Sequence, residues 1–183
     1  MNWGLPKSVE LGGTEYEIRS DYRPILDICA ASADPELSGE EKTAAVLGIF
    51  YMDADSIPPE LWRDAVEKCF WFINGGDDAD GKKSTRLVDW EQDYSLIIAP
   101  INRVIGGEAR AVEYMHWWTF LAAYQEIGDC TFAQVVRIRD RLARGKKLDK
   151  TDREWYRKNR HLVDFKRKYT SADEELMKEW GGS

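Results

Sequence analysis

Apolar residues recur at three- and four-residue steps along most of this chain, the spacing that gathers them on one face of an α-helix. The clearest stripe runs from Leu61 to Ile73, begins after Pro58–Pro59 and stops at Asn74–Gly75. Cys69 belongs to this stripe, and we therefore expect it in the core. Two earlier helices are marked by starting signals at Asp21, with Pro24 in the first turn, and at the Ser38–Glu41 capping box.

Near the N-terminus the apolar residues recur at every second position, as in a β-strand, rather than at every third or fourth, as in a helix. Val9 and Leu11 precede the Gly12–Gly13 pair, and Tyr16 and Ile18 follow it in alternation with glutamates. Such alternation around a glycine pair predicts a two-stranded β-hairpin. A lone hairpin is only marginally stable, so we expect a helix to cover it.

The second half of the chain is also patterned as helices. Asp89 and Gln92 predict the start of a helix that Gly106–Gly107 ends, and Tyr114–Tyr124 is apolar on nearly every side, as in a helix at the centre of a bundle. Three further capping boxes predict helices from Thr131 to about Arg144, from Thr151 to about Lys168 and from Ser171 to about Trp180. The expected fold class is mostly α, a helical bundle with a small N-terminal β-hairpin.

Charge divides the chain into two parts. Residues 1–80 hold 6 Lys/Arg and 17 Asp/Glu, a net charge of −11, whereas residues 81–183 hold 20 and 16, a net charge of +4. The boundary falls in residues 74–86, where no apolar residue is larger than Ala79. We expect one compact domain, made of an acidic part (1–80, hairpin plus helices) and a helical part (81–183) with basic C-terminal helices, and a mobile loop at 74–86.

Composition excludes several classes of protein. Among 183 residues, 43% are hydrophobic and eight are Trp, which is enough to build a core and excludes wholesale disorder. The overall charge of −7 argues against a generic nucleic-acid coat protein. Three cysteines without a CxxC pair and an N-terminus without an apolar signal segment favour the reducing cytoplasm. The longest apolar stretch is too short to cross a membrane.

Candidate catalytic chemistry is sparse. Glu113 and His116 have the Glu-x-x-His spacing of a di-iron ligand pair, but the second such pair is missing, so we expect a structural role for His116 with its ring nitrogens hydrogen-bonded. Cys130 stands at a predicted helix start, where a thiol pKa can fall, but we expect it there as a small side chain at a helix entrance rather than as a reactive thiol. We predict no catalytic, cofactor-binding or metal-binding residues, and no enzyme.

The segment 137–168 stands out, with 14 Lys/Arg against 5 Asp/Glu, a net charge of +9. On the predicted helix the arginines share one ridge, opposite Trp155 and Leu162. Arg139 instead projects into the apolar face of its helix and requires a carboxylate or a partner surface. Three interpretations stay open: a solvated face neutralised by the acidic part with Arg139 in an internal ion pair, an acidic protein partner, or nucleic acid. The candidate partner-binding residues are Arg139, Arg153, Arg157, Arg160 and Arg167.

The central segments resemble the bacteriophage "gene product fifteen" family of siphophages and of prophages of Gram-positive bacteria. The resemblance covers roughly residues 86–142, and its most specific element is the His-Trp-Trp run at 116–118 followed by Phe120. The motifs that carry the resemblance are Asp89–Tyr94, Leu96–Ala99, His116–Leu121, Thr131–Phe132 and Val136–Arg139. We call five residues among them the structural core motif: Trp90, His116, Trp117, Trp118 and Phe120. Pro100 departs from the family pattern and predicts a kink in its helix.

This resemblance implies a non-enzymatic tail assembly chaperone in the cytoplasm of the bacterial host. Its task would be to coat the tape-measure protein during virion morphogenesis until the tail tube polymerises around it. The implied partners are the tape-measure protein, other tail proteins and further copies of the chain, with no membrane. The alternative function is a nucleic-acid-binding regulator that uses the basic helices of residues 137–168, with Arg153, Arg157, Arg160 and Lys168 on phosphates.

Overall fold

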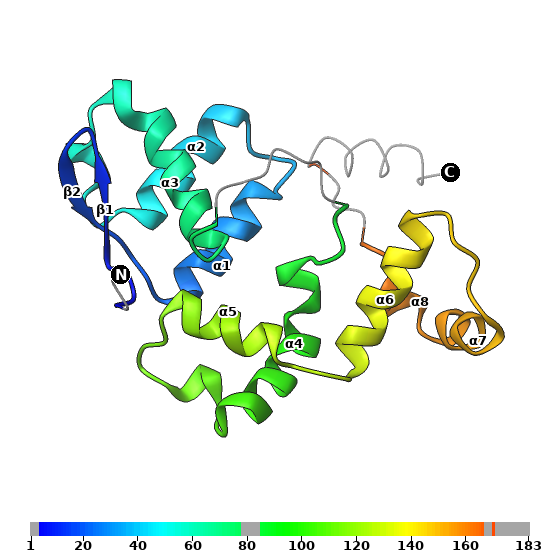
Figure 1. Cartoon of the computed structure of the whole chain (residues 1–183). Helices are drawn as coiled ribbons and strands as arrows, with labels where there is room; N and C mark the ends of the chain where they lie inside the picture. Colours follow the sequence, from blue (N-terminus) through cyan, green and yellow to red (C-terminus); the bar gives the residue numbers. More distant parts are fainter. Residues whose placement is uncertain (1–3, 78–84, 167–169, 171–183) are drawn as a thin grey trace, which may run out of the picture.

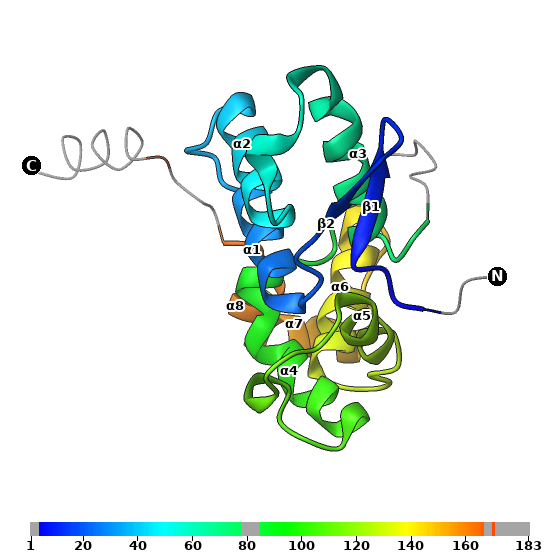
Figure 2. The same cartoon turned by 90° about the vertical axis from the view of Figure 1, so that its left-hand side faces the viewer.

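The computed structural model of the chain describes residues 4–77, 85–166 and 170. It is predominantly helical with one small sheet, which confirms the predicted fold class. Figure 1 shows the hairpin β1–β2 and helices α1–α3 gathered at one end, α4 and α5 in the middle, and α6–α8 at the other end. Figure 2 shows the same arrangement from the side of the hairpin.

The predicted hairpin is present, formed by β1 (Ser8–Leu11) and β2 (Thr14–Glu17). Gly12 and Gly13 supply the turn with φ angles of 56° and 82°, a region that side chains rarely adopt. Val9 and Leu11 are buried, and β1 contacts helix α3. The hairpin therefore gains the helical cover that so small a sheet needs.

Three helices follow the hairpin: α1 (Tyr22–Ser32), α2 (Gly39–Phe50) and α3 (Trp62–Ile73). Short 3₁₀ turns at Ala54–Ser56 (η1) and Pro59–Leu61 (η2) lie between α2 and α3. The starting signals are confirmed, since Asp21 caps α1 and Ser38 and Glu41 form a reciprocal capping box on α2. Cys69 is fully buried, as its place in the stripe predicts.

The next two helices are α4 (Trp90–Ile105) and α5 (Trp117–Gln125), separated by a 3₁₀ turn at Ala109–Ala111 (η3). Asp89 caps α4, Pro100 lies within it, and Gly106 ends it with φ 73°. The prediction that helix starts at Tyr114 is wrong by three residues. The ring of His116 accepts a hydrogen bond from the N–H of Trp118, so His116 is the N-cap of α5 and Tyr114 precedes the helix.

The last described helices are α6 (Thr131–Ala143), α7 (Lys150–Lys158) and α8 (Arg160–Val163). Cys130 caps α6 through its sulfur and Asp149 caps α7, so the caps predicted at Thr131 and Thr151 lie one and two residues late. The first helical residue of α6 is nevertheless Thr131, as expected, and that of α7 is Lys150. The predicted continuous helix to Lys168 is also wrong, because Asn159 interrupts it and α8 ends at Val163. The helix predicted from Ser171 lies outside the described residues.

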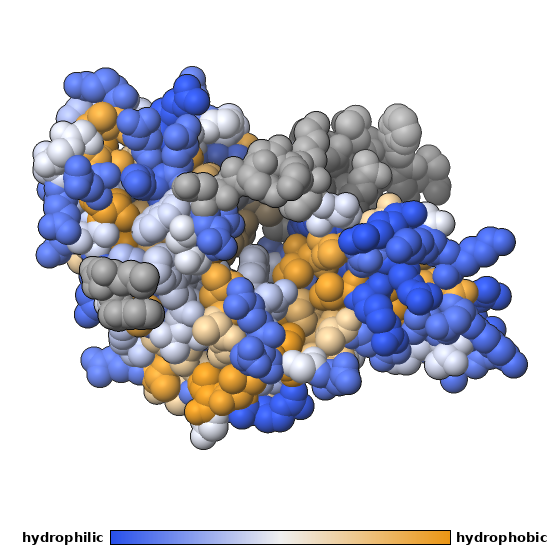
Figure 3. All heavy atoms as spheres, in the orientation of Figure 1, coloured by the Kyte–Doolittle hydropathy of each residue, from blue (hydrophilic) through white to orange (hydrophobic). Residues whose placement is uncertain are grey.

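Both charge-distinct parts contribute to one hydrophobic core, which includes residues from Val9 to Phe132. At its centre the rings of Tyr22 and Phe120 stack at 4.5 Å between centroids, joining α1 to α5. A second, smaller cluster of Val135, Ile138, Leu148 and Val163 holds α6–α8 together. Part of the predicted loop at 74–86, residues 78–84, lies outside the described residues. The space-filling view shows hydrophilic residues gathered over the α6–α8 end (Figure 3).

Candidate partner-binding surface

Arg139 lies inside the protein and is only 4% exposed. Its guanidinium forms a two-pronged ion pair with Asp93 of α4, at 2.6 and 3.0 Å. The remaining N–H groups donate to the carbonyl oxygens of Leu87, Leu162 and Val163 at 2.7–3.0 Å. All five donors of the guanidinium are thus used within the chain. The internal ion pair is therefore the interpretation of Arg139 that the structure supports, and Arg139 leaves the set of partner-binding candidates.

The same contacts explain why α8 ends at Val163. Arg139 takes up the carbonyl oxygens of Leu162 and Val163, which a continuing helix would need for its own hydrogen bonds. Between α7 and α8 the chain is interrupted at Asn159, which donates from its backbone and its side chain to the carbonyl oxygen of Trp155. The predicted four-arginine ridge therefore does not exist as one helix face. Arg167, its last member, lies outside the described residues.

Sequence reasoning missed Asp93 as the partner of Arg139, although a signal was present. Asp93 lies on the apolar stripe of α4, three residues after Trp90 and four before Ile97, and it is fully buried. When two helices each carry one charge of opposite sign within an apolar stripe, the simplest expectation is that the two side chains form an ion pair with each other. The ring of Phe165 covers the pair, with its centroid 4.1 Å from the guanidinium carbon of Arg139.

The arginines that remain available lie on α7 and at the start of α8. Asp149 caps α7, and the buried carboxylate of Asp152 accepts a hydrogen bond from Arg137 of α6 at 2.8 Å. Trp155 packs on the small hydrophobic cluster of α6–α8, which fixes the inner side of α7. The outer side then exposes three arginines, which we call the basic surface: Arg153, Arg157 and Arg160.

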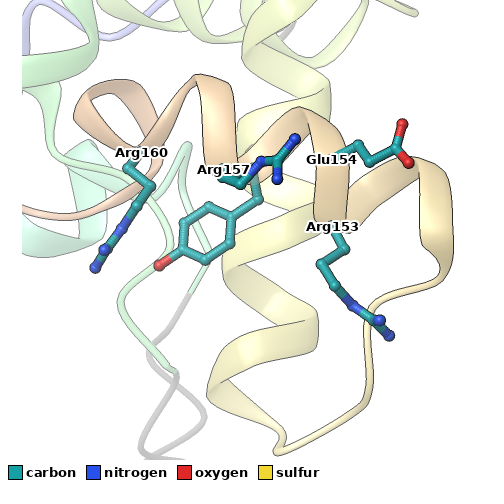
Figure 4. A pocket seen from close by; sticks show the side chains of 5 residues that line it. Arg153, Glu154, Arg157 and Arg160 are labelled. Carbon is teal, nitrogen blue, oxygen red and sulfur yellow. The ribbon is translucent and has the colours of Figure 1, made fainter.

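The basic surface surrounds a hollow of about 470 Å³, whose lining also includes Glu154 and Tyr156. Figure 4 shows Arg153 and Arg160 on opposite sides of this hollow, with Arg157 between them. Three of the predicted partner-binding residues are thus brought together, even though they belong to two helices. The hollow combines positive charge with the ring of a tyrosine.

The three arginine side chains differ in how many hydrogen bonds and ion pairs they already form within the chain. Arg160 donates through Nε to Asp164 at 3.2 Å, and Arg153 donates one hydrogen bond to the carbonyl of Leu148. The side chain of Arg157 has no ion pair or hydrogen bond to any residue in the described part of the chain. The Tyr156 hydroxyl donates to Asp164 at 2.6 Å, which raises its pKa and keeps it neutral. Most guanidinium donors of the basic surface therefore face solvent.

Within the described residues, the acidic part of the chain forms no ion pair with this surface. Where both partners are described residues, every ion pair joins two residues of the same charge-distinct part, either 1–80 or 81–183. The two parts meet instead through the apolar core and through backbone hydrogen bonds, such as Trp117 N–H to the Ser20 carbonyl at 2.7 Å. The molecule is consequently polarised. The end formed by the hairpin and α1–α3 is acidic (the acidic end), and the end formed by α6–α8 carries the basic surface.

Both ring nitrogens of His116 are hydrogen-bonded, as predicted. Its Nδ1 accepts from the N–H of Trp118 at 3.0 Å, so its Nε2 carries the proton and donates to the Pro6 carbonyl at 2.9 Å. Burial lowers the pKa of the ring, although the bond to Pro6 acts in the opposite direction. The neutral ring thus caps α5 and fastens the segment before β1.

The rest of the core motif packs around α5. The indole nitrogens of Trp117 and Trp118 donate to the carbonyl oxygens of Ile73 and Phe72 at the end of α3. The ring of Trp90 lies 5.6 Å from that of Trp117 and also contacts Phe120. The motif therefore joins α3, α4 and α5 within the core.

The other chemical candidates do not converge on a site. Glu113 is exposed and precedes α5, while both ring nitrogens of His116 are already hydrogen-bonded. Among residues 4–77, 85–166 and 170, no cluster of three metal-ligating side chains is found. The sulfur of Cys130 accepts from the N–H of Ala133 as a helix cap. Within the described residues, no helix is both long and apolar enough to cross a membrane.

Comparison with known proteins adds one finding. No curated protein and no solved structure matches the chain. A family model described as Bacteriophage Gp15 protein matches residues 1–165, which include the hairpin, the core motif and the basic surface. The match extends well beyond the segment 86–142 on which the resemblance rests. The chain therefore belongs to the Bacteriophage Gp15 protein family, a membership that indicates a structural or assembly protein of a phage.

Proposed function

We propose that the chain is a non-enzymatic chaperone or adaptor of phage tail assembly that binds the tape-measure protein in the cytoplasm of the bacterial host. Family membership supports an assembly role. The observation that carries the proposal further is the basic surface, whose arginines form no ion pair with any described residue of the acidic part. A surface of this kind suits transient binding of a charged helical partner, because complementary charge gives specificity and fast association.

Co-expression with a tape-measure protein from the same phage or prophage tests the proposal. We expect the chain to raise the soluble fraction of that protein. The variant Arg153→Glu/Arg157→Glu should lose most of this effect. The matched control is Lys42→Glu/Arg63→Glu, which changes the net charge equally but alters the acidic end, where Arg63 is exposed. Equal solubility with and without the chain would refute the proposal.

The alternative function, a nucleic-acid-binding regulator, would use the same arginines on phosphates. Several carboxylates argue against it, since Glu154 lines the hollow and Asp164 holds Arg160. The two functions differ in a simple measurement. Nucleic-acid binding would weaken steeply with salt for duplex or single-stranded DNA or RNA, and a flat isotherm at low salt would remove this alternative.

A further inference from the structure

We propose that the hollow of the basic surface is the docking site for an acidic helical segment of the partner protein. This inference rests on the proposed function and adds the chemistry of the contact. Carboxylates of the segment would pair with Arg153, Arg157 and Arg160, and an apolar side chain between them would cover the ring of Tyr156.

The spacing of the arginines favours a helix as the ligand. Arg153 and Arg157 lie four residues apart on α7, and Arg160 continues the row at the start of α8 (Figure 4). Carboxylates at three- and four-residue steps on a facing helix repeat at the same interval. Each guanidinium keeps terminal N–H groups that can bind a carboxylate in a two-pronged manner.

The remaining lining residues favour a peptide over a phosphate chain. The Tyr156 hydroxyl is already bound to Asp164, and the guanidinium carbon of Arg160 lies 5.7 Å from the centroid of the ring. The part of the ring that Arg160 leaves uncovered suits an apolar side chain. Glu154 lies beside the arginines, where it would repel a continuous row of phosphates. A peptide can place a neutral or basic residue opposite Glu154, which a nucleic-acid backbone cannot do.

Shape argues against a second copy of the chain as the occupant. The acidic end offers a hollow of its own, of about 250 Å³, whose lining includes Glu10, Asp64 and Glu67. Two concave surfaces of opposite charge cannot fill one another. A convex helix with the same charge as the acidic end can enter the basic hollow, and complementary packing is what makes such contacts specific.

Fluorescence anisotropy at low ionic strength tests this inference with a pair of labelled helical peptides of about six turns. One carries Glu and Leu at three- and four-residue steps, and its counterpart has Gln in place of each Glu. We expect the Glu peptide to bind at least tenfold more tightly. Arg157→Gln should weaken its binding about fivefold, the upper range for one exposed ion pair. Lys158→Gln, an equal charge change outside the hollow, should leave it unchanged.

Three results would overturn the inference: equal binding of both peptides, an Arg157→Gln variant that binds like the unmodified chain, or tighter binding of duplex DNA than of the Glu peptide. Sedimentation of the chain alone at low salt adds a fourth, because self-association that Arg157→Gln abolishes would make a second copy the occupant. Failure of the proposed function would look different. The chain would then bind the Glu peptide yet leave the solubility of the tape-measure protein unchanged.

Discussion

Asp93 and Arg139 form a two-pronged ion pair between α4 and α6, with both side chains at most 4% exposed. Removing one member of such a pair leaves an uncompensated buried charge and costs about 3–5 kcal/mol. We expect Asp93→Asn to destabilise the protein by about this amount. Arg139→Met should cost more, because the carbonyl oxygens of Leu87, Leu162 and Val163 also lose their donor. Urea unfolding measures both.

The control for the ion pair is Arg137→Met, on the same helix α6. Arg137 also binds an aspartate, Asp152, but its own side chain is 57% exposed. Asp152 is itself buried, but it keeps a second cation when Arg137 is removed, since Arg141 lies 3.9 Å away. Because solvent also screens Arg137, we expect a smaller loss, about 1–2 kcal/mol. A loss as large as that of Arg139→Met would contradict the distinction between the two arginines.

His116 should make stability depend on pH. Its pKa is lowered in the folded protein, so the unfolded chain binds more protons in the window just below the ordinary value of about 6.5. The stabilisation is therefore complete above that value and is lost as the pH falls through the folded pKa. Urea unfolding between pH 7 and pH 5 should show this decline. His116→Asn keeps a side-chain acceptor for the helix cap and should flatten the curve. An unchanged slope would contradict the assignment.

Gly76 combines a positive φ with a close neighbour. Its φ is 94°, and a Cβ added there would lie 3.0 Å from the ring of Trp118. We expect Gly76→Ala to cost about 1–2 kcal/mol for the left-handed backbone and a further amount for displacing the ring. Gly13→Ala is the matched control, with φ 82° and no atom within 4 Å of the added Cβ. If thermal unfolding shows the same loss of stability for both variants, the ring of Trp118 can move away from the added Cβ at no energetic cost.

Cys29 and Cys69 should be inert in the folded protein. Burial raises the pKa of Cys29 to about 11 and, as the larger of two causes, that of Cys69 to about 12. Only the thiolate reacts with iodoacetamide, so near pH 8 both residues should stay unmodified until urea unfolds the chain. Mass spectrometry of peptides distinguishes the two cysteines. Rapid labelling of Cys69 without urea would contradict its full burial.

The sequence predicts the helical architecture well because caps and stripes are local signals. Asp21, Ser38, Asp89 and Gly106 mark helix ends where a nearby side chain or a positive φ satisfies the backbone. The errors arise where a distant group competes with a local one. His116 caps α5 while it also reaches Pro6, and α8 ends at Val163, where Arg139 of α6 takes up the last carbonyl oxygens.

The candidate site was predictable only in part, for the same reason. Exposure of Arg153, Arg157 and Arg160 follows from their place opposite Trp155, which a single helix pattern reveals. The fate of Arg139 depended on Asp93, a residue of another helix. Periodicity shows that a buried charge needs a partner, but the packing of α4 against α6 decides which one.

The five hydrogen bonds of Arg139 also constrain the order in which the chain can fold during synthesis. Asp93 leaves the ribosome 46 residues before Arg139, and the carbonyl oxygens of Leu162 and Val163 follow some 24 residues later. Until residue 163 has been made, the guanidinium lacks two of its acceptors, and burying it is costly. The hairpin and α1–α3 meet their partners earlier, since these lie on α5, where Phe120 stacks on Tyr22 and Trp118 donates to the carbonyl of Phe72. The layer of α6–α8, with the basic surface on it, is therefore completed last in each newly made molecule.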